Sequence, residues 1–281
     1  MTSPFMIRKM EQDEVAVAVS WADREGWNPG IHDGTALFSG NPDGMWVAEE
    51  EDQVVGMVSG LWLSSSSANM GFYLVRPDCR GRGVGKALRK RAEHRLQGCT
   101  VCTYTPEYLE PRFLRQGFAP SYTVVRCKGD AGGVLSVDPF LIPLTDVPFK
   151  HLVDFDATFY SASREAFLAS WITRPGVVAL GVLQDGHLAG YGVIRQACHG
   201  FRIGPLYAVH PSHAHRLYKA LRAYGGQGPV YIDLPLENPH SQEFMETFEL
   251  TPGERWISMY RGDEPAKPLS GLYGITAMEL G

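Results

Sequence analysis

The sequence predicts an α/β protein of two similar domains in tandem, each a mixed, mostly antiparallel sheet flanked by helices. Three observations predict this fold class. Segments with the two-residue period of strands alternate with segments that have the period of amphipathic helices. Two neighbouring strand segments read as a hairpin, which favours a mixed sheet over a purely parallel one. The same order of segments also occurs twice along the chain.

The duplication consists of short matching sequences at an offset of about 134 residues. Each match is weak alone, but the matches share their order and their offset. Examples are "PFMI" and "PFLI" (residues 4–7 and 139–142), "YLVRP" and "YAVHP" (73–77 and 207–211), and "VVRCKG" and "ISMYRG" (124–129 and 257–262).

The segment "CKGDAGGVLSVD" separates the two copies. It is small, polar and glycine-rich, as linkers are. We therefore expect a first domain at residues 1–130 and a second domain at residues 137–281.

The elements of the first copy follow from its patterns in chain order. "FMIRKM" predicts a short strand, and "EQDEVAVAVSWADREG" predicts an amphipathic helix with acids in its first turn that ends near Gly26. "MWVAEE" and "QVVGMVSGLWL" predict a hairpin around Glu51 and Asp52. "GFYLVR" predicts the next strand.

A basic helix is predicted after this strand, because one face collects Val84, Leu88 and Ala92. "TVCTYT" then predicts a strand, and "EYLEPRFLRQ" predicts a helix that is interrupted or started at Pro111. "YTVVRC" predicts the last strand of the copy.

The composition is that of an ordinary soluble protein, with 44% hydrophobic and 20% charged residues among 281. The net charge of −5 provides no general attraction for nucleic acid or for an anionic membrane. No apolar run approaches the roughly 18–20 residues that span a bilayer, and the first residues lack a signal-peptide pattern. We expect a cytoplasmic protein that binds neither nucleic acid nor membrane.

The five cysteines are odd in number and scattered, which fits reduced thiols. Cys99 and Cys102 form a C-x-x-C pattern, but on a strand residues three apart point to opposite faces. No second Cys/His pair with ligand spacing lies nearby. We expect no metal site.

The segment "CRGRGVGKALRKR", at residues 79–91, predicts a phosphate-binding turn. Its glycines let the backbone approach an anion, and the first N–H groups of the following helix are free to bind it. A Walker A loop does not fit, since Gly81 to Gly85 is one residue short and Ala87 follows Lys86 where a hydroxyl is needed. A dinucleotide fingerprint is disfavoured because the turn follows about four strands rather than the first.

The spacing R-x-x-G-x-G, with Arg80, Gly83 and Gly85, resembles the acetyl-CoA motif of the GCN5-related N-acetyltransferases (GNAT). "YLVRP" resembles the strand before that motif, and "RFLRQGF" resembles a later family helix that ends in Gly-Phe. "RIGPLYAVHP", "YIDLPLEN" and "LYGITAMELG" resemble the second domain of two-domain members. The resemblance implies an N-acetyltransferase with acetyl-CoA as co-substrate.

The loop physics agrees with a coenzyme pyrophosphate, since backbone N–H groups and the positive end of the helix dipole converge there. The residues expected to contact the coenzyme around this turn are Arg80, Gly81, Arg82, Gly83, Val84, Gly85 and Lys86. The resemblance further implies that Tyr73, Leu74 and Val75 offer backbone N–H groups to the pantetheine and to the thioester carbonyl.

The acceptor side carries weaker signals. Trp27, His32 and Asp33 lie in "EGWNPGIHD", which resembles the N-domain loop of two-domain members, and Asp33 and His32 are the candidate bases for a substrate ammonium. Asp233, in the second domain, is a candidate to attract a cationic amine. The acceptor is expected to be a primary amine on a small molecule or peptide, and the sequence names neither it nor the oligomeric state.

The acid that protonates the leaving thiolate departs from the family pattern. The usual tyrosine position, four residues before the glycine of Gly-Phe, holds Phe113. Tyr108 is the candidate acid in its place, with Tyr104 or a water as alternatives.

The second copy has lost the coenzyme motif. Ala214, Leu217 and Lys219 stand where the first copy has Arg80, Gly83 and Gly85, so we expect no coenzyme there. His210, His213 and His215 lack a clear fourth ligand and are expected to be structural. Two hypotheses follow: an amine N-acetyltransferase with one active site, or a non-catalytic acyl-CoA-binding or regulatory module.

Overall fold

The computed structural model of the chain describes residues 4–133, 138–160 and 163–279. Residues 134–137 of the expected linker lie outside these ranges. We call residues 4–133 the first half and residues 138–279 the second half. The strands and helices of the first half are β1 (Met6–Lys9), α1 (Val15–Arg24), α2 (Asp33–Gly40), β2 (Met45–Glu50), β3 (Gln53–Trp62), β4 (Ser67–Val75), α3 (Val84–Arg95), β5 (Thr100–Pro106), α4 (Glu110–Leu114) and β6 (Ala119–Asp130).

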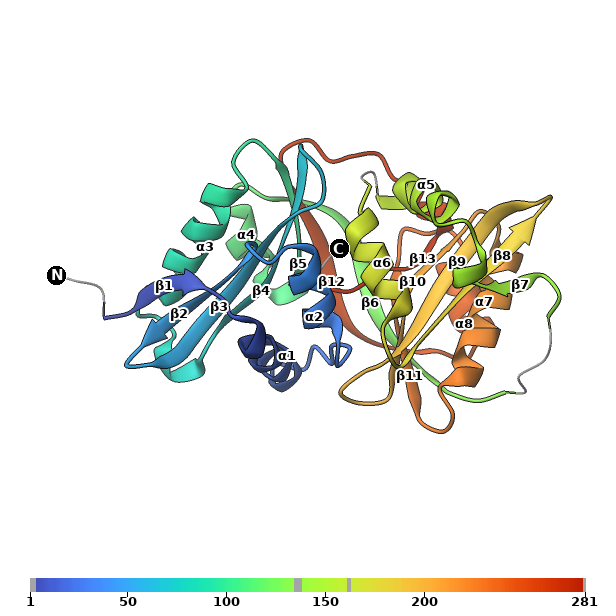
Figure 1. Cartoon of the computed structure of the whole chain (residues 1–281), viewed down its shortest axis with the longest axis horizontal. Helices are drawn as coiled ribbons and strands as arrows, with labels where there is room; N and C mark the ends of the chain where they lie inside the picture. Colours follow the sequence, from blue (N-terminus) through green and yellow to red (C-terminus); the bar gives the residue numbers. More distant parts are fainter. Residues whose placement is uncertain (1–3, 134–137, 161–162, 280–281) are drawn as a thin grey trace.

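The second half repeats a similar order, as Figure 1 shows. Its elements are β7 (Leu141–Pro143), α5 (Phe149–Tyr160), α6 (Glu165–Thr173), β8 (Val177–Gln184), β9 (His187–Gln196), β10 (Phe201–Ala208), α7 (Pro211–Tyr224), β11 (Pro229–Pro235), α8 (Ser241–Thr247), β12 (Thr251–Arg261) and β13 (Leu272–Gly274). The α/β class with a mixed sheet flanked by helices is therefore confirmed.

Local patterns account for most of the first half. The hairpin between β2 and β3 turns at Glu51 and Asp52, whose φ angles of 51° and 58° are those of a type I′ turn. Helix α1 buries Val15, Ala18 and Ala22 at the spacing of an amphipathic helix. Helix α2 was not predicted, because its eight residues include two glycines and a weak apolar pattern.

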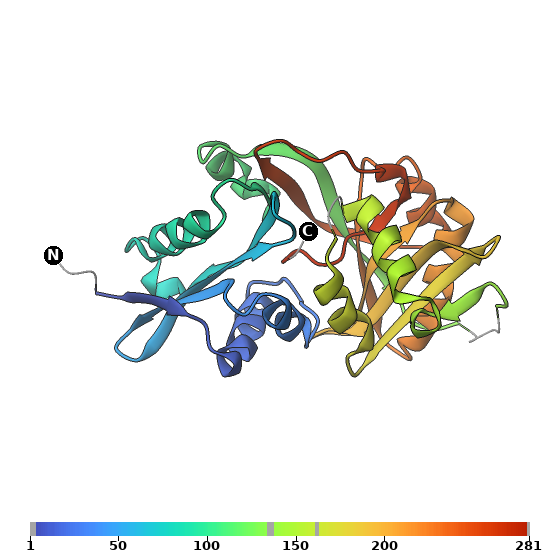
Figure 2. The ribbon, with the colours of Figure 1, turned by 45° about the horizontal axis from the view of Figure 1, so that its top comes forward.

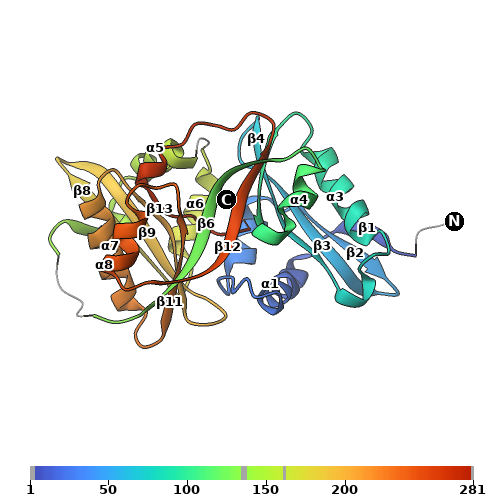
Figure 3. The same ribbon diagram turned by 180° about the vertical axis from the view of Figure 1, so that it is seen from behind.

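The strands form one continuous sheet in which the two halves exchange strands. The order is β1-β2-β3-β4-β5-β12-β6-β11-β10-β9-β8-β7, and β13 pairs with β10 off this path. Strand β12 of the second half thus lies between β5 and β6, while β6 of the first half pairs with β11. Figure 3 shows β6 and β12 side by side where the halves meet. The division into domains at residues 130–137 stays a prediction, and the sheet does not separate there.

Three apolar cores cover the sheet. The core of α3 and α4 lies on one face of the first half, and α7 and α8 lie over a second core. The third core fills the junction, where α1 and α2 face α5 and α6. Figure 2 shows α2 and α6 next to each other between the halves. A site at the junction therefore draws side chains from both halves.

Candidate functional site

Strands β4 and β5 separate partway along their length. Their parallel pairing runs from Ser67 and Thr100 to Asn69 and Cys102, and it ends there although β4 continues to Val75. The Thr103 hydroxyl donates to the Met70 carbonyl at 2.8 Å, at the point of separation. Beyond it, the edge of β4 that faces β5 has backbone groups available to a ligand.

A bulge in β4 sets which N–H groups face this gap. The pairing with β3 shifts between Met57 and Ser59, opposite Phe72, whose φ is 42°. The Gly71 N–H donates to the Ser59 hydroxyl at 3.1 Å.

After the bulge, the alternation of antiparallel pairs decides the direction of each N–H. The Arg76 N–H donates to the Val55 carbonyl, so the Leu74 N–H also points to β3, while those of Tyr73 and Val75 point to the gap. Two of the three N–H groups expected to bind the coenzyme, those of Tyr73 and Val75, are therefore available, and the expectation for Leu74 was wrong. Its N–H serves the sheet.

The glycine-rich turn lies between the 3₁₀ turn Pro77–Cys79 and α3. Gly81 and Gly83 have φ angles of 80° and 89°, which only glycine adopts freely, and a Cβ at either would meet no atom within 4 Å. Gly83 begins the helix without a side-chain cap, and its carbonyl accepts from the Ala87 N–H. The N–H groups of Val84, Gly85 and Lys86 precede that first helical bond and face the open side of the turn.

Gly85 is a glycine for a different reason. A Cβ there would lie 2.8 Å from the Tyr73 hydroxyl, so Gly85 lets α3 pack on β4. The Tyr73 hydroxyl in turn accepts a hydrogen bond from Arg112 at 3.3 Å. Burial raises the pKa of Tyr73, so its phenol stays protonated at neutral pH.

The arginines of the turn pair with nearby acids. Arg80 contacts Glu25 at 2.5 Å and donates to the Val75 carbonyl at 3.0 Å, and Arg82 contacts Glu50 at 2.5 Å. Both guanidinium groups are about half exposed, where ion pairs exchange readily. A bound phosphate can therefore replace the carboxylates as the partner of either arginine.

Asp33 is placed differently from its expected role as a base. It is fully buried and contacts two arginines of the second half, Arg195 at 2.8 Å and Arg174 at 3.0 Å. Burial alone would raise its pKa, but these arginines outweigh burial and lower the pKa to about 2. Because such a carboxylate takes up a proton poorly, we correct the assignment: Asp33 joins the halves.

The other expected acceptor residues also lie in this joint. Asp233 is buried between Arg126 and Arg202, so its charge is already satisfied and does not serve a free amine. The Trp27 carbonyl accepts from Arg126 at 2.6 Å, and its ring packs edge-to-face on Trp256. The carbonyl of the exposed His32 accepts from Arg174 at 3.0 Å. The loop is therefore fixed by buried charges.

The candidate acids for the thiolate are dispersed. Tyr108 is 80% exposed in the 3₁₀ turn Glu107–Leu109, beyond the end of β5. Tyr104 is buried and its hydroxyl lies 2.5 Å from that of Tyr122. Phe113, at the usual tyrosine position, packs edge-to-face on Phe118 in the core under α3 and α4. Tyr108 remains a prediction.

The second half has the same separation of strands, but its own chain fills the gap. Strands β10 and β11 pair from Phe201 to Ile203, and beyond that point β13 pairs with β10 through Leu206 and Tyr207. The turn is also missing, because α7 begins at Pro211, the counterpart of Pro77. Ala214 and Leu217 are thus buried helix residues. The missing turn and the filled gap are structural reasons to expect no coenzyme in the second half.

The described residues include neither a cluster of metal ligands nor a membrane-spanning helix. No group of three His, Cys, Asp or Glu among them is placed to hold a metal ion. His210 caps α7 by accepting the Ser212 N–H at 3.2 Å. In the same ranges, no helix is long and apolar enough to cross a bilayer.

One buried carboxylate at the junction, that of Glu279, was not predicted from the sequence. Glu279 is 1% exposed, and within the described part of the chain neither carboxylate oxygen has a hydrogen-bond partner. "LYGITAMELG" carries no chemical pattern that distinguishes this glutamate, so only its burial reveals it.

A pocket of about 270 Å³ also opens between the halves. Leu37 and Trp62 of the first half face Arg164 and Phe167 of the second across it. Arg164 is held by Asp156, and its remaining nitrogen Nη1 is buried without a hydrogen-bond partner among the described residues.

Comparisons with known proteins agree with this architecture. A model of the acetyltransferase (GNAT) family matches residues 7–118, and a model of an acetyltransferase (GNAT) domain matches residues 152–274. Holothin acyltransferase from Pseudoalteromonas sp. (strain SANK 73390) is 26% identical over 96% of this chain and 92% of its own.

Two solved structures share the fold over nearly the whole chain. A putative acetyltransferase from Pyrococcus horikoshii has a TM-score of 0.83 at 20% identity, covering 100% of this chain and 97% of its own. A tandem GNAT protein from the clavulanic acid biosynthesis pathway has a TM-score of 0.64 at 18% identity, covering 94% and 100%. With GNAT matches in both halves, an open gap in the first and a filled one in the second, the chain belongs to the GNAT acyltransferases as a tandem member.

Proposed function

We propose that the first half transfers an acetyl group from acetyl-CoA to a primary amine by direct attack. The observation that carries this proposal is that an open turn before α3 follows β4 in the chain, and that the edge of β4 beyond Asn69 is not paired with β5. Phosphates fit the first, and a pantetheine and thioester fit the second.

Each part has a defined task in this reaction. The N–H groups of Val84, Gly85 and Lys86, with Arg80 and Arg82, hold the pyrophosphate. The N–H groups of Tyr73 and Val75 bind the pantetheine and polarise the carbonyl. A neutral amine then attacks the carbonyl carbon without a covalent enzyme intermediate.

The test is thiol release from acetyl-CoA with a panel of amines, followed with a thiol-reactive dye. Ethylamine, benzylamine, tryptamine, glucosamine and spermidine cover simple, aromatic, sugar and polyamine acceptors. Holothin joins the panel because one relative is named for it. Amine-dependent release above the rate of hydrolysis supports the proposal.

The alternative is a non-catalytic acyl-CoA-binding module. The buried Phe113 and the exposed Tyr108 favour it, since they leave the thiolate without a positioned acid at those two places. Saturable binding of acetyl-CoA without turnover of any amine in the panel would decide for this alternative.

A further inference from the structure

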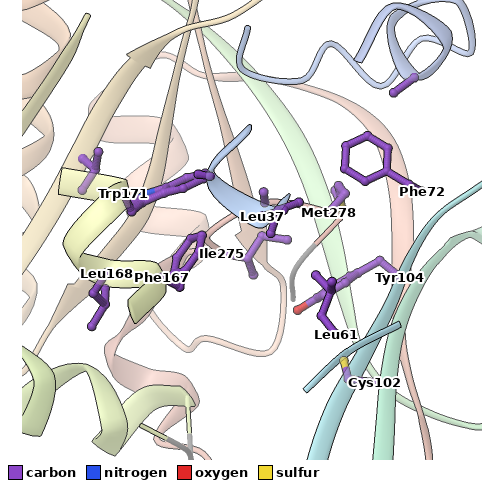
Figure 4. Packing of buried hydrophobic residues seen from close by; sticks show 14 of the residues in the cluster. Leu37, Leu61, Phe72, Cys102, Tyr104, Phe167, Leu168, Trp171, Ile275 and Met278 are labelled. Atoms are coloured by element: carbon purple, nitrogen blue, oxygen red, sulfur yellow. The ribbon is translucent and has the colours of Figure 1, made fainter. Parts of the chain in front are cut away.

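The segment after β13 connects the filled gap of the second half with the open gap of the first. We call Ile275–Glu279 the junction segment. The Ile275 N–H donates to the Asp233 carbonyl, and Arg195 donates to the Thr276 carbonyl at 3.2 Å. Figure 4 shows Ile275 and Met278 among Leu37, Phe72 and Tyr104 of the first half, within the junction core. The segment is therefore packed between the halves.

Glu279 lies on β4 where β4 and β5 separate. A Cβ at Gly71 would lie 2.4 Å from the Glu279 carbonyl oxygen and 3.2 Å from its Cα, so Gly71 is a glycine because Glu279 rests on it. Gly71 lies just beyond Met70, which follows Asn69, the last β4 residue paired with β5. Glu279 therefore lies at the start of the proposed thioester site.

The two faces of β4 have different neighbours at this point. Ala68 and Met70 point into the core under α3, so the alternation of the strand places Asn69 and Gly71 on the opposite face. That face carries the junction core, which includes residues of α1 and α2. Glu279 is thus on the face of β4 opposite helix α3, at the buried junction between the halves.

Within the described ranges, two residues near Gly71 have buried polar side-chain atoms without a hydrogen-bond partner. Both oxygens of Glu279 and both amide atoms of Asn69 lack a hydrogen-bond partner among the described residues, although Asn69 is fully buried. Leaving such groups unpaired is costly, so a ligand that satisfies them gains by binding. A carboxylate and an amide carbonyl are acceptors that suit a substrate ammonium.

Charged groups from three elements face the Glu279 carboxylate. Burial raises its pKa, Arg202 of β10 opposes that rise and Asp33 at the start of α2 adds to it, while the nearby backbone N–H of Glu279 and then Arg126 of β6 oppose it. The net effect is a pKa above the usual glutamate value. A base with a raised pKa is better matched to neutral pH than an ordinary carboxylate.

We propose that Glu279 is the proton acceptor for the acceptor amine in the first-half site, a step that rests on the proposed acetyl transfer. The Glu279 carboxylate takes one proton from the substrate ammonium, directly or through one water. The neutral nitrogen then forms a bond to the thioester carbonyl carbon, and the carbon–sulfur bond breaks with its electron pair leaving on sulfur. The second proton of the nitrogen passes to that thiolate, and Glu279 returns its proton to solvent.

The test separates proton removal from the rest of the reaction. Wild type and Glu279→Gln are compared with ethylamine, which is protonated at pH 7, and with 2,2,2-trifluoroethylamine, which is neutral there. The fastest amine of the panel is a third probe. We expect kcat/KM for the protonated amines to fall by about 10²–10⁴-fold and that for trifluoroethylamine by far less. The dependence of kcat/KM on pH should also lose its acidic limb.

Glu254→Gln is the matched control. Glu254 is an exposed glutamate on β12 that acts on the same Arg126, so its removal changes the charge near the cluster without touching the site. We expect wild-type rates from it. The unfolding temperature of Glu279→Gln should stay close to that of wild type, because the amide has the size of the carboxyl, and the burial cost of the charge is lost together with its attraction to Arg202 and Arg126.

Two results would overturn this inference. Wild-type rates in Glu279→Gln would exclude the carboxylate, and equal losses for protonated and neutral amines would show that the residue acts only on structure. If wild type itself binds acetyl-CoA but releases thiol with no amine tested, the proposed function fails, and Glu279 has no proton to accept.

Discussion

The two halves share one architecture but treat the same gap between strands in opposite ways. In the first half, β4 and β5 separate after Asn69 and Cys102, and the gap opens beside a glycine-rich turn. In the second half, β10 and β11 separate after Ile203 and Ile232, and β13 fills the gap. The two halves thus share their sheet, while only the first has both the open gap and the glycine-rich turn on which the proposed site depends.

The filled gap has become part of the joint between the halves. Strand β12 lies between β5 and β6, and buried ion pairs of Asp33 and Asp233 link residues more than a hundred positions apart. The second half thereby supports the open gap and delivers Glu279 to it.

The largest expected effect comes from breaking this joint with Asp33→Asn. The change leaves Arg174 and Arg195 buried with no full counter-charge, and we expect a loss of about 3–5 kcal/mol in the free energy of unfolding. Chemical denaturation measures it. Asp154→Asn, which removes an exposed partner of Lys150, is the control and should leave stability unchanged. Similar stability of both variants would show that Asp33 does not hold the halves together.

The ion pairs of Asp33 also predict how the free energy of unfolding depends on pH. The folded-state pKa of Asp33, about 2, lies below its ordinary value of 3.8, so its ion pairs stabilise the protein above pH 3.8. This contribution disappears as pH falls from 3.8 through about 2. The free energy of unfolding of Asp33→Asn should therefore fall less steeply with acid than that of wild type.

The next effect concerns the filled gap. Leu272 of β13 is 4% exposed and lies in the junction core, so Leu272→Ala should cost about 2–5 kcal/mol in the free energy of unfolding by leaving a cavity beside β13. Because the second half lacks the glycine turn, the loosened gap should gain no coenzyme. Calorimetric titration with acetyl-CoA checks this, and a second equivalent bound per chain would mean that β13 alone prevents binding.

The smallest effect concerns the thiolate. Tyr108 is 80% exposed, so water competes with it as the proton donor, and Tyr108→Phe should slow thiol release by less than about tenfold, below the usual 10²–10⁴ of a positioned acid. Steady-state rates measure this. A hundredfold fall would establish Tyr108 as the acid predicted from the sequence.

Local patterns predicted most elements of the first half, with helix α2 as an exception, and they also predicted the glycine-rich turn. The hairpin at Glu51 and Asp52, the helix after Gly83 and the loss of the motif near Ala214 all follow from residues close in the sequence. The family resemblance added the expected edge of β4, which the register then refined at Leu74.

Pairing between distant residues was beyond those patterns. Nothing in the period of β12 specifies that it inserts between β5 and β6, since any strand can pair with any free edge. Asp33 and Asp233 were expected to serve an acceptor because their arginine partners are remote in the sequence. Glu279 was missed for the same reason, because only the fold brings it to Gly71.

The central claim is that the first half alone binds the coenzyme, and calorimetric titration with acetyl-CoA tests it most directly. We predict one equivalent per chain. Gly83→Trp should weaken binding by at least about tenfold, since losing one hydrogen bond to a charged group costs about 1.5–3 kcal/mol. Lys219→Trp, at the exposed counterpart of Gly85 on α7, should bind like wild type. Unchanged binding in Gly83→Trp, or loss of binding in Lys219→Trp, would contradict the account.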